Sequence, residues 1–315
     1  MTLLNVSNNP ARDPILALLS GDDGAVLALI AGVEGPSYRP VGAMMSVFTE
    51  TERAGTLSSG CVEADISLHA LAAREAGKPN LVRYGRGSPF ADIQLPCGGG
   101  LDILLLPDPD RAVLQKVADA RAARRACTLQ TDVRTGAMAL ADSGPTGLDG
   151  AVMQVRFEPD IRFLVFGKGP EASTFASLVQ SAGYPNMLLS PDEETLEDAA
   201  QAGCETRHLV SQEFPGDVAV DEWTAIVLFF HDHEWEPPIL TAALKTPAFY
   251  IGAQGSQRAR DLRFAEMVAL GAPTAELARL RGPIGLIPSA RDAGTLTVSV
   301  LAEVLAATMD KKAAP

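Results

Sequence analysis

Cys61 is the residue of this sequence with the clearest chemical potential, because a thiolate is both a nucleophile and a soft metal ligand. It stands in SSGCVE, directly before a segment that reads as a helix and two residues before Glu63. A helix N-terminus favours the thiolate, whereas a neighbouring carboxylate opposes it. The alternative is a small apolar side chain that fills a tight turn. We predict a reactive thiol at Cys61 with a catalytic or cofactor-binding role.

Cys97 stands in a second unusual setting, LPCGGG, where Gly98 and Gly99 follow it. Glycines after a thiol let backbone N–H groups approach a ligand closely. The alternative is a glycine bulge at the edge of a strand. The remaining cysteines, Cys127 and Cys204, are predicted to be structural, because filling small apolar space is the commonest role of a free cysteine.

A glycine turn occurs in FLVFGKGPEAS, directly after an apolar strand pattern and before a helix pattern. Gly167 permits the tight turn, Gly169 permits close approach of a phosphate, and Ala172 keeps the helix near the strand. The next strand ends at Ser190, where a nicotinamide dinucleotide site carries an acid, and Glu171 adds a negative charge at the helix start. The pattern predicts a Rossmann-like turn and leaves the presence of NAD open.

Two further loops follow strand patterns in the same half of the chain. His231, Asp232 and His233 follow one strand, and Ser256 and Arg258 follow the next. Two histidines and one carboxylate are an incomplete metal site, so contact with an anion or a pterin is favoured over metal. A hydroxyl and an arginine at a helix start suit an anionic group. The alternatives are a plain loop and a solvated basic surface.

Strand and helix patterns indicate how these residues are positioned. The first half mixes short strands with helices, including a helix after Cys61 and a hairpin over residues 127–142. The rhythm changes near Pro159, after which apolar strands alternate with helices, which is typical of a parallel sheet covered on both faces. The sequence predicts an α/β protein in which a small α+β domain, residues 1–158, precedes a Rossmann-like domain, residues 159–315.

Charge and composition exclude several classes of function. The chain has 315 residues, and its 39 acidic and 26 basic residues give a net charge of −13, which disfavours a nucleic acid partner. No apolar run reaches the ~18 residues of a membrane span, and no signal peptide is evident at the start. Dispersed cysteines without a CxxC motif suggest reduced thiols, so we expect a cytoplasmic protein.

Taken together, these motifs resemble the XdhC/CoxI family of molybdenum-cofactor maturation proteins. The resemblance extends from about residue 35 to about residue 307 and is carried by GPSYRPVGAMM, SSGCVEADI, LPCGGGLDILL, FGKGPEAS, FFHDHEWEPPILTAAL, FYIGAQGSQRARDLR and RLRGPIGLIPSARDAGTLTVSVLAEVLA. The cysteine motifs of the first half, together with HDH and GS-x-R in the second, are more specific than the glycine turn. This sequence departs from the family pattern at Ser59, Lys168, Met44 and Ser190.

The resemblance implies a chaperone rather than a stand-alone catalyst. Such proteins bind molybdopterin or its dinucleotide form, support its sulfuration, some with a cysteine desulfurase, and deliver it to a xanthine dehydrogenase or aldehyde oxidoreductase. We also expect a homodimer. The positions that it marks as cofactor-binding are Cys61, Glu63, Cys97, Gly98, Gly99, Gly167, Gly169, His231, Asp232, His233, Ser256 and Arg258.

Two other interpretations stay open at this point. An NAD(P)-dependent oxidoreductase would use the glycine turn, with His231 or His233 as acid or base. A regulatory protein would bind a nucleotide and do no chemistry. The cysteine–glycine motifs of the first half have no role in hydride transfer, which favours the cofactor chaperone.

Overall fold

The chain was analysed as a computed structural model, and the structure describes residues 13–21, 23–58, 60, 62–89, 98–231 and 234–313, with side chains as far as Met309. The chain divides into two compact units, residues 1–159 and residues 160–315. None of the described helices is long and apolar enough to cross a membrane.

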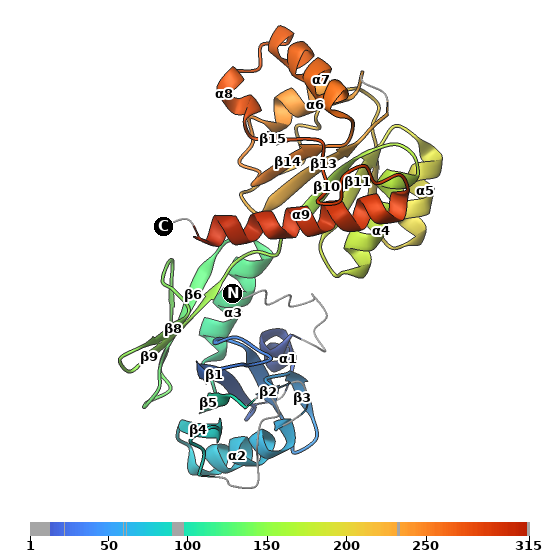
Figure 1. Cartoon of the computed structure of the whole chain (residues 1–315). Helices are drawn as coiled ribbons and strands as arrows, with labels where there is room; N and C mark the ends of the chain where they lie inside the picture. Colours follow the sequence, from blue (N-terminus) through green and yellow to red (C-terminus); the bar gives the residue numbers. More distant parts are fainter. Residues whose placement is uncertain are drawn as a thin grey trace. The chain divides into compact units, whose positions relative to one another are not determined.

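In its described residues, the first unit contains two antiparallel sheets and the helices α1, α2 and α3 (Figure 1). The larger sheet has the strand order β3-β2-β1-β5-β4, and the smaller one has the order β7-β6-β9-β8. The strands of the larger sheet are β1 (Val26–Glu34), β2 (Met44–Val47), β3 (Arg53–Gly55), β4 (Asn80–Gly85) and β5 (Gly100–Pro107). The smaller sheet consists of β6 (Cys127–Asp132), β7 (Met138–Ala141), β8 (Gly147–Asp149) and β9 (Val152–Phe157).

The larger sheet is covered on both faces because its strands alternate apolar side chains between two cores. Helix α2 (Glu63–Ala76) places Ile66, Ala70 and Ala73 on one helical face and packs them against one side of the sheet. The other side packs against α1 (Pro14–Ser20), α3 (Arg111–Ala122) and the smaller sheet. Helix α2 ends at Gly77, whose φ of 62° is left-handed and favours glycine.

The second unit is a six-stranded parallel sheet with the order β12-β11-β10-β13-β14-β15. Its strands are β10 (Arg162–Gly167), β11 (Asn186–Ser190), β12 (Glu205–His208), β13 (Thr224–Phe229), β14 (Tyr250–Ala253) and β15 (Leu280–Arg281). Its helices are α4 (Pro170–Ser181), α5 (Glu193–Gln201), α6 (Glu236–Ala243), α7 (Gln257–Ala269), α8 (Thr274–Leu277) and α9 (Ala293–Ala313). Helices α4 and α9 pack on one face, and α6, α7 and α8 lie on the other (Figure 1).

This architecture confirms the predicted fold class, a mixed α+β unit followed by a Rossmann-like parallel sheet. The strand order reverses between β10 and β13, which is the place where ligands bind in open α/β sheets. The sequence patterns did not predict β8, β15, α6 or α8. The two strands have only three and two residues, and α8 has four, which is too short for a periodic signal.

Candidate functional site

Three loops leave the larger sheet of the first unit at the same end. Strands β1, β3 and β4 run in one direction, while β2 and β5 run antiparallel to them. Residues 35–43 connect β1 to β2, residues 56–62 connect β3 to α2, and residues 86–99 connect β4 to β5. All three connections therefore start at the same end of the sheet, which we call the loop end. Cys61 and Cys97 belong to two of these loops. Both cysteines lie outside the described residues, but the described residues on either side of each one lie at the loop end.

Glu63 organises the loop that contains Cys61. Its carboxylate is buried and accepts hydrogen bonds from the Thr56 hydroxyl at 2.6 Å and from the N–H groups of Ser58 and Gly60, each at 2.8 Å. The Ser58 hydroxyl donates to Oε2, the carboxylate oxygen that also accepts from the Gly60 N–H, and the Val62 N–H donates to the Ser58 hydroxyl at 3.1 Å. One side chain thus holds the backbone on both sides of Cys61.

The hydrogen bonds to Glu63 keep its carboxylate ionised. Burial alone would raise the pKa of Glu63, but the bonds donated by Ser58, Thr56 and Gly60 outweigh burial and lower the pKa to about 2. No described cation forms an ion pair with this carboxylate. Glu63 was predicted to bind the cofactor, but the contacts of its carboxylate show that it holds the loop around Cys61.

The three glycines that follow Cys97 have distinct reasons to be glycine. Gly98 is exposed with a φ of 69°. A Cβ on Gly99 would lie 2.1 Å from the carbonyl oxygen of Pro36, and one on Gly100 would lie 2.5 Å from the guanidinium of Arg83. Gly99 and Gly100 therefore permit close packing within the protein.

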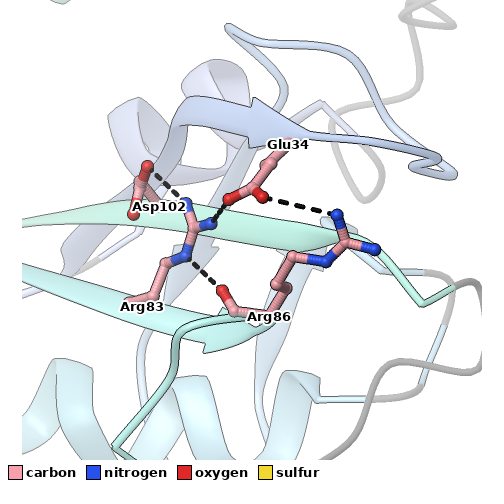
Figure 2. A network of polar contacts seen from close by, with 4 residues as sticks. All are labelled: Glu34, Arg83, Arg86 and Asp102. Carbon is pink, nitrogen blue, oxygen red and sulfur yellow. Dashed lines mark hydrogen bonds and ion pairs between the residues drawn. The ribbon is translucent and has the colours of Figure 1, made fainter.

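Arg83 joins the ends of three strands at the loop end (Figure 2). Its guanidinium donates to Asp102 on β5 at 2.9 Å, to Glu34 on β1, and to the carbonyl oxygen of Arg86 at 2.8 Å. The N–H of Arg86 in turn donates to the carbonyl oxygen of Gly99 at 3.0 Å. These bonds fix the chain where it enters and leaves the segment that contains Cys97.

The glycine turn of the second unit has the predicted geometry. Gly167 has no room for a Cβ, which would lie 2.7 Å from the carbonyl oxygen of Phe229 and 2.8 Å from the Cβ of Ala172. Gly169 has a φ of 88° and is the N-cap of α4. The turn therefore brings α4 close to β10 and β13, as the glycine pattern predicts.

The N–H of Gly169 is already used inside the protein. It donates to the Thr195 hydroxyl at 2.9 Å, and this hydroxyl donates to the Asp192 carboxylate at 2.6 Å. The hydrogen bonds from Thr195 hold the pKa of Asp192 below its ordinary value, and Lys168 adds a smaller favourable charge. Ser190 is fully buried and its hydroxyl accepts from the N–H of Asp192 at 3.1 Å. The turn thus keeps the N–H of Gly169 for the protein itself, and Pro170 has no N–H, so Glu171 and Ala172 carry the first backbone donors left for an anion.

A pocket of about 900 Å³ lies beside this turn, at the carboxyl ends of the parallel strands. The Glu171 carboxylate at the start of α4 forms an ion pair with His231 after β13, with 3.3 Å between Oε2 and Nε2. Trp235 stacks on Phe230 with 5.9 Å between ring centroids. The lining residues are Lys168, Gly169, Pro191, Asp192, Phe230, His231, Glu234, Trp235 and Glu266.

A buried ion pair supports the loops that follow β13 and β14, and no sequence pattern had indicated it. Arg263 on α7 donates to Glu236 on α6 at 2.8 Å and to the carbonyl oxygen of Gln254 at 2.7 Å. The Gln254 side chain lies 3.4 Å from the His231 ring nitrogen. The sequence did contain one signal, because Arg263 lies one helical turn before Met267 on the face of α7 that is buried.

The predicted site residues of the second unit fall into three groups: those that line the pocket, those absent from its lining, and those outside the described residues. Gly169 and His231 line the pocket, whereas Gly167, Ser256 and Arg258 are absent from its lining. The Ser256 hydroxyl instead accepts from the N–H of Ala259 and caps α7. Asp232 and His233, like Cys61 and Cys97, lie outside the described residues. Cys127 and Cys204 are buried free thiols, as predicted, and burial raises the pKa of both.

Comparison with known proteins agrees with this architecture. Residues 163–304 match the XdhC Rossmann domain, and residues 18–85 match the XdhC and CoxI family. The chain is 34% identical to the molybdenum cofactor insertion chaperone PaoD of Escherichia coli K12, across 93% of this chain and 86% of that protein. It is 25% identical to a probable xanthine dehydrogenase subunit of Bacillus subtilis 168, across 92% of this chain and 94% of that protein.

A solved structure shares the fold of both units. It is the crystal structure of a xanthine dehydrogenase from Bacillus halodurans, which superimposes with a TM-score of 0.74 at 21% sequence identity. The alignment covers 96% of this chain and 97% of that one. At this identity the likeness shows the fold alone.

Proposed function

Because this chain belongs to the XdhC and CoxI family, we propose that it binds a molybdenum cofactor and supports its insertion into an enzyme of the xanthine dehydrogenase type. The observation that carries the proposal is the 34% identity to a molybdenum cofactor insertion chaperone across 93% of the chain. The ligand is molybdopterin or its dinucleotide form.

The loop end of the first unit fits such a ligand. Cysteine supplies the soft donor that suits a molybdenum–sulfur centre. The described neighbours of Cys61, and Arg86 and Gly99 on either side of the segment that contains Cys97, are held by hydrogen bonds at this end of the sheet. Glu63 and Arg83 act here as positioning residues, because each forms hydrogen bonds to the loop backbone. When bound, the cofactor supplies the metal and its sulfur ligands, and this chain supplies the fixed loops that receive them.

The glycine turn of the second unit supports the proposal, because it is poorly suited to the pyrophosphate of NAD(P). Gly169 donates its N–H to Thr195, residue 170 is a proline without an N–H, and Glu171 places a carboxylate at the helix start. A pyrophosphate at this turn would meet one N–H that Thr195 already uses, one residue without an N–H and the like charge of Glu171, and would have only the next N–H groups of α4 as backbone donors. These contacts argue against the oxidoreductase alternative.

Further partners belong to the same proposal. A cysteine desulfurase would supply sulfur for the cofactor, and a homodimer is the expected assembly. The free thiols of Cys127 and Cys204 favour work in a reducing compartment such as the cytoplasm.

The experiment is co-expression of the chain with a client molybdoenzyme. Wild-type protein is expected to be purified with molybdopterin and to raise client activity. Cys61→Ser is expected to fold normally, because a serine is nearly isosteric, and to lose client activation, with a milder loss for Cys97→Ser. Cys204→Ser is the matched control, since this thiol is buried in the second unit.

Two results would contradict the proposal. Full client activation by Cys61→Ser would return that residue to a structural role. Steady NADH or NADPH oxidation by the purified wild-type protein with simple alcohols, acids or aldehydes would favour the oxidoreductase instead.

A further inference from the structure

Arg39 is an arginine at the loop end whose guanidinium has no partner among the described residues. It lies in loop 35–43 and is part-buried. Its Nε is buried, and nothing in the described part of the chain accepts a hydrogen bond from it. Among the described residues no carboxylate forms an ion pair with Arg39 either, so this part-buried guanidinium keeps its charge and its donors.

Arg83, at the same end of the same sheet, shows what a satisfied arginine looks like. Its three nitrogens donate to Asp102, to Glu34 and to the carbonyl oxygen of Arg86. Both of these carboxylates are thereby committed to Arg83, and Glu34 also lies 3.6 Å from the guanidinium of Arg86. Glu34 and Asp102 are thus paired with Arg83 and Arg86, and neither carboxylate neutralises Arg39.

The backbone around Arg39 is fixed, so its open donors are not explained by a loose loop. The Ser37 hydroxyl donates to the carbonyl oxygen of Arg39 at 2.7 Å and accepts from its N–H at 3.3 Å. The carbonyl oxygen of Pro36 packs against Gly99, two residues after Cys97. Loop 35–43 therefore holds Arg39 in place next to the chain that leaves the Cys97 segment.

The buried Nε is closed to a ligand, whereas the two terminal nitrogens of this part-buried side chain have no partner among the described residues and stay accessible to an acceptor from outside the chain. A planar guanidinium pairs best with an oxyanion such as phosphate, to which it can donate two parallel hydrogen bonds. We propose that Arg39 binds the phosphate group of the ligand held at the loop end. This rests on the proposed function in one respect, the identity of the molecule that carries the phosphate.

The test uses the full-length protein and inorganic phosphate as the probe, with sodium chloride at matched ionic strength as the control. Phosphate is expected to raise the melting temperature of the wild-type protein, since a ligand that binds only the folded state stabilises it. Arg39→Met is expected to weaken phosphate binding by about tenfold or more, the effect of losing a charge-assisted hydrogen bond. Without phosphate, Arg39→Met is expected to melt at or above the wild-type temperature.

Two matched variants separate binding from folding. Arg279→Gln removes an arginine of the second unit that donates to the carbonyl oxygens of Leu244, Thr246 and Ala248, and it is expected to lower the melting temperature and keep the phosphate response. Arg86→Gln removes an exposed neighbouring charge, with 67% of its side chain accessible, and is expected to change phosphate affinity less than threefold. Arg39→Lys keeps the charge without the planar fork and is expected to bind with intermediate affinity.

An unchanged phosphate response in Arg39→Met would overturn the inference, and so would a wild-type protein that does not respond to phosphate. Molybdopterin content of the same variants after co-expression is measured separately. If wild-type protein retains no molybdopterin but its phosphate response depends on Arg39, the proposed function fails and the anion site stands. If molybdopterin is retained equally by wild type and Arg39→Met, the proposed function stands and the anion site fails.

Discussion

The loop 56–62 of the first unit and the glycine turn of the second are both backbone turns whose N–H groups meet an acceptor from the protein itself. In the first unit the acceptor is the ionised Glu63 carboxylate, which collects bonds from several groups at once. In the second unit it is one neutral hydroxyl, that of Thr195, which passes the bond on to Asp192. The charge and the number of bonds differ, so the two turns should differ in how much stability they contribute.

The same comparison shows how to recognise a binding site. Both turns carry motifs typical of ligand binding, yet the N–H groups of Ser58, Gly60 and Gly169 are used internally. Arg39 belongs to a less conspicuous motif, and its guanidinium has no partner among the described residues. A complete account of donors and acceptors therefore separates a structural turn from a binding residue better than the motif does.

Replacing the charged acceptor is expected to give the largest effect. Glu63→Gln keeps the size of the side chain but replaces one accepting oxygen with an NH2 group, which faces the hydrogen-bond donors of the loop. We expect a loss of about 3 kcal/mol of unfolding free energy at pH 7. The measurement is urea denaturation of the purified variant. Glu75→Gln, on the exposed part of the same helix, is the control and is expected to stay within about 0.5 kcal/mol of wild type. A small loss in Glu63→Gln would mean that the loop does not depend on the carboxylate.

The stability from Glu63 should also depend on pH. Its pKa of about 2 in the folded state lies below the ordinary value of 4.5, so the contribution is complete above pH 4.5 and is lost as the pH falls toward 2. The difference in unfolding free energy between wild type and Glu63→Gln should shrink by about 1 kcal/mol between pH 6 and pH 3.5. A difference that stays constant over this range would show that Glu63 is not ionised in the folded protein.

Arg83→Gln tests a cation that holds the loop end, where Glu63 is the corresponding anion. The substitution leaves Glu34 and Asp102 near one another without their shared cation, and we expect a loss of about 1–2 kcal/mol. High salt should reduce the loss, because these carboxylates are partly exposed and their repulsion is screened. Denaturation at low and at 1 M salt checks both statements. A loss that is independent of salt would assign the effect to packing of the Arg83 stem.

Local patterns predicted the fold well, because strand and helix periodicity are properties of adjacent residues. The turn at Gly167 and Gly169 was visible for this reason. Its occupation by Thr195 was not, since that hydroxyl lies 26 residues further along the chain. The partners of Arg83 are similarly remote, and they depend on the register that pairs Arg83 with Asp102. Glu63 was assigned to the ligand because its motif is typical of the family, whereas its hydrogen bonds follow from the path of the loop.

Thr195→Val tests the neutral acceptor and is expected to have a smaller effect. It leaves the N–H of Gly169 without its acceptor and removes one of the two hydrogen bonds that Thr195 donates to Asp192, and we expect a loss of about 1 kcal/mol. Thr195→Ser keeps the hydroxyl and should differ from wild type by less than half of that. Denaturation of the three proteins provides the measurement. A loss in Thr195→Val as large as that in Glu63→Gln would remove the distinction between the two turns.

Arg258→Gln is expected to have the smallest effect, because the side chain is exposed and is absent from the lining of the pocket. Its unfolding free energy should stay within about 0.5 kcal/mol of wild type. Lys168→Gln is the matched comparison, since Lys168 does line the pocket and contributes a favourable charge to Asp192. If the pocket contacts the cofactor, molybdopterin retention after co-expression should fall in Lys168→Gln and remain near wild type in Arg258→Gln. The reverse result would place the ligand at the start of α7 and outside this pocket, as the arginine motif of the sequence had suggested.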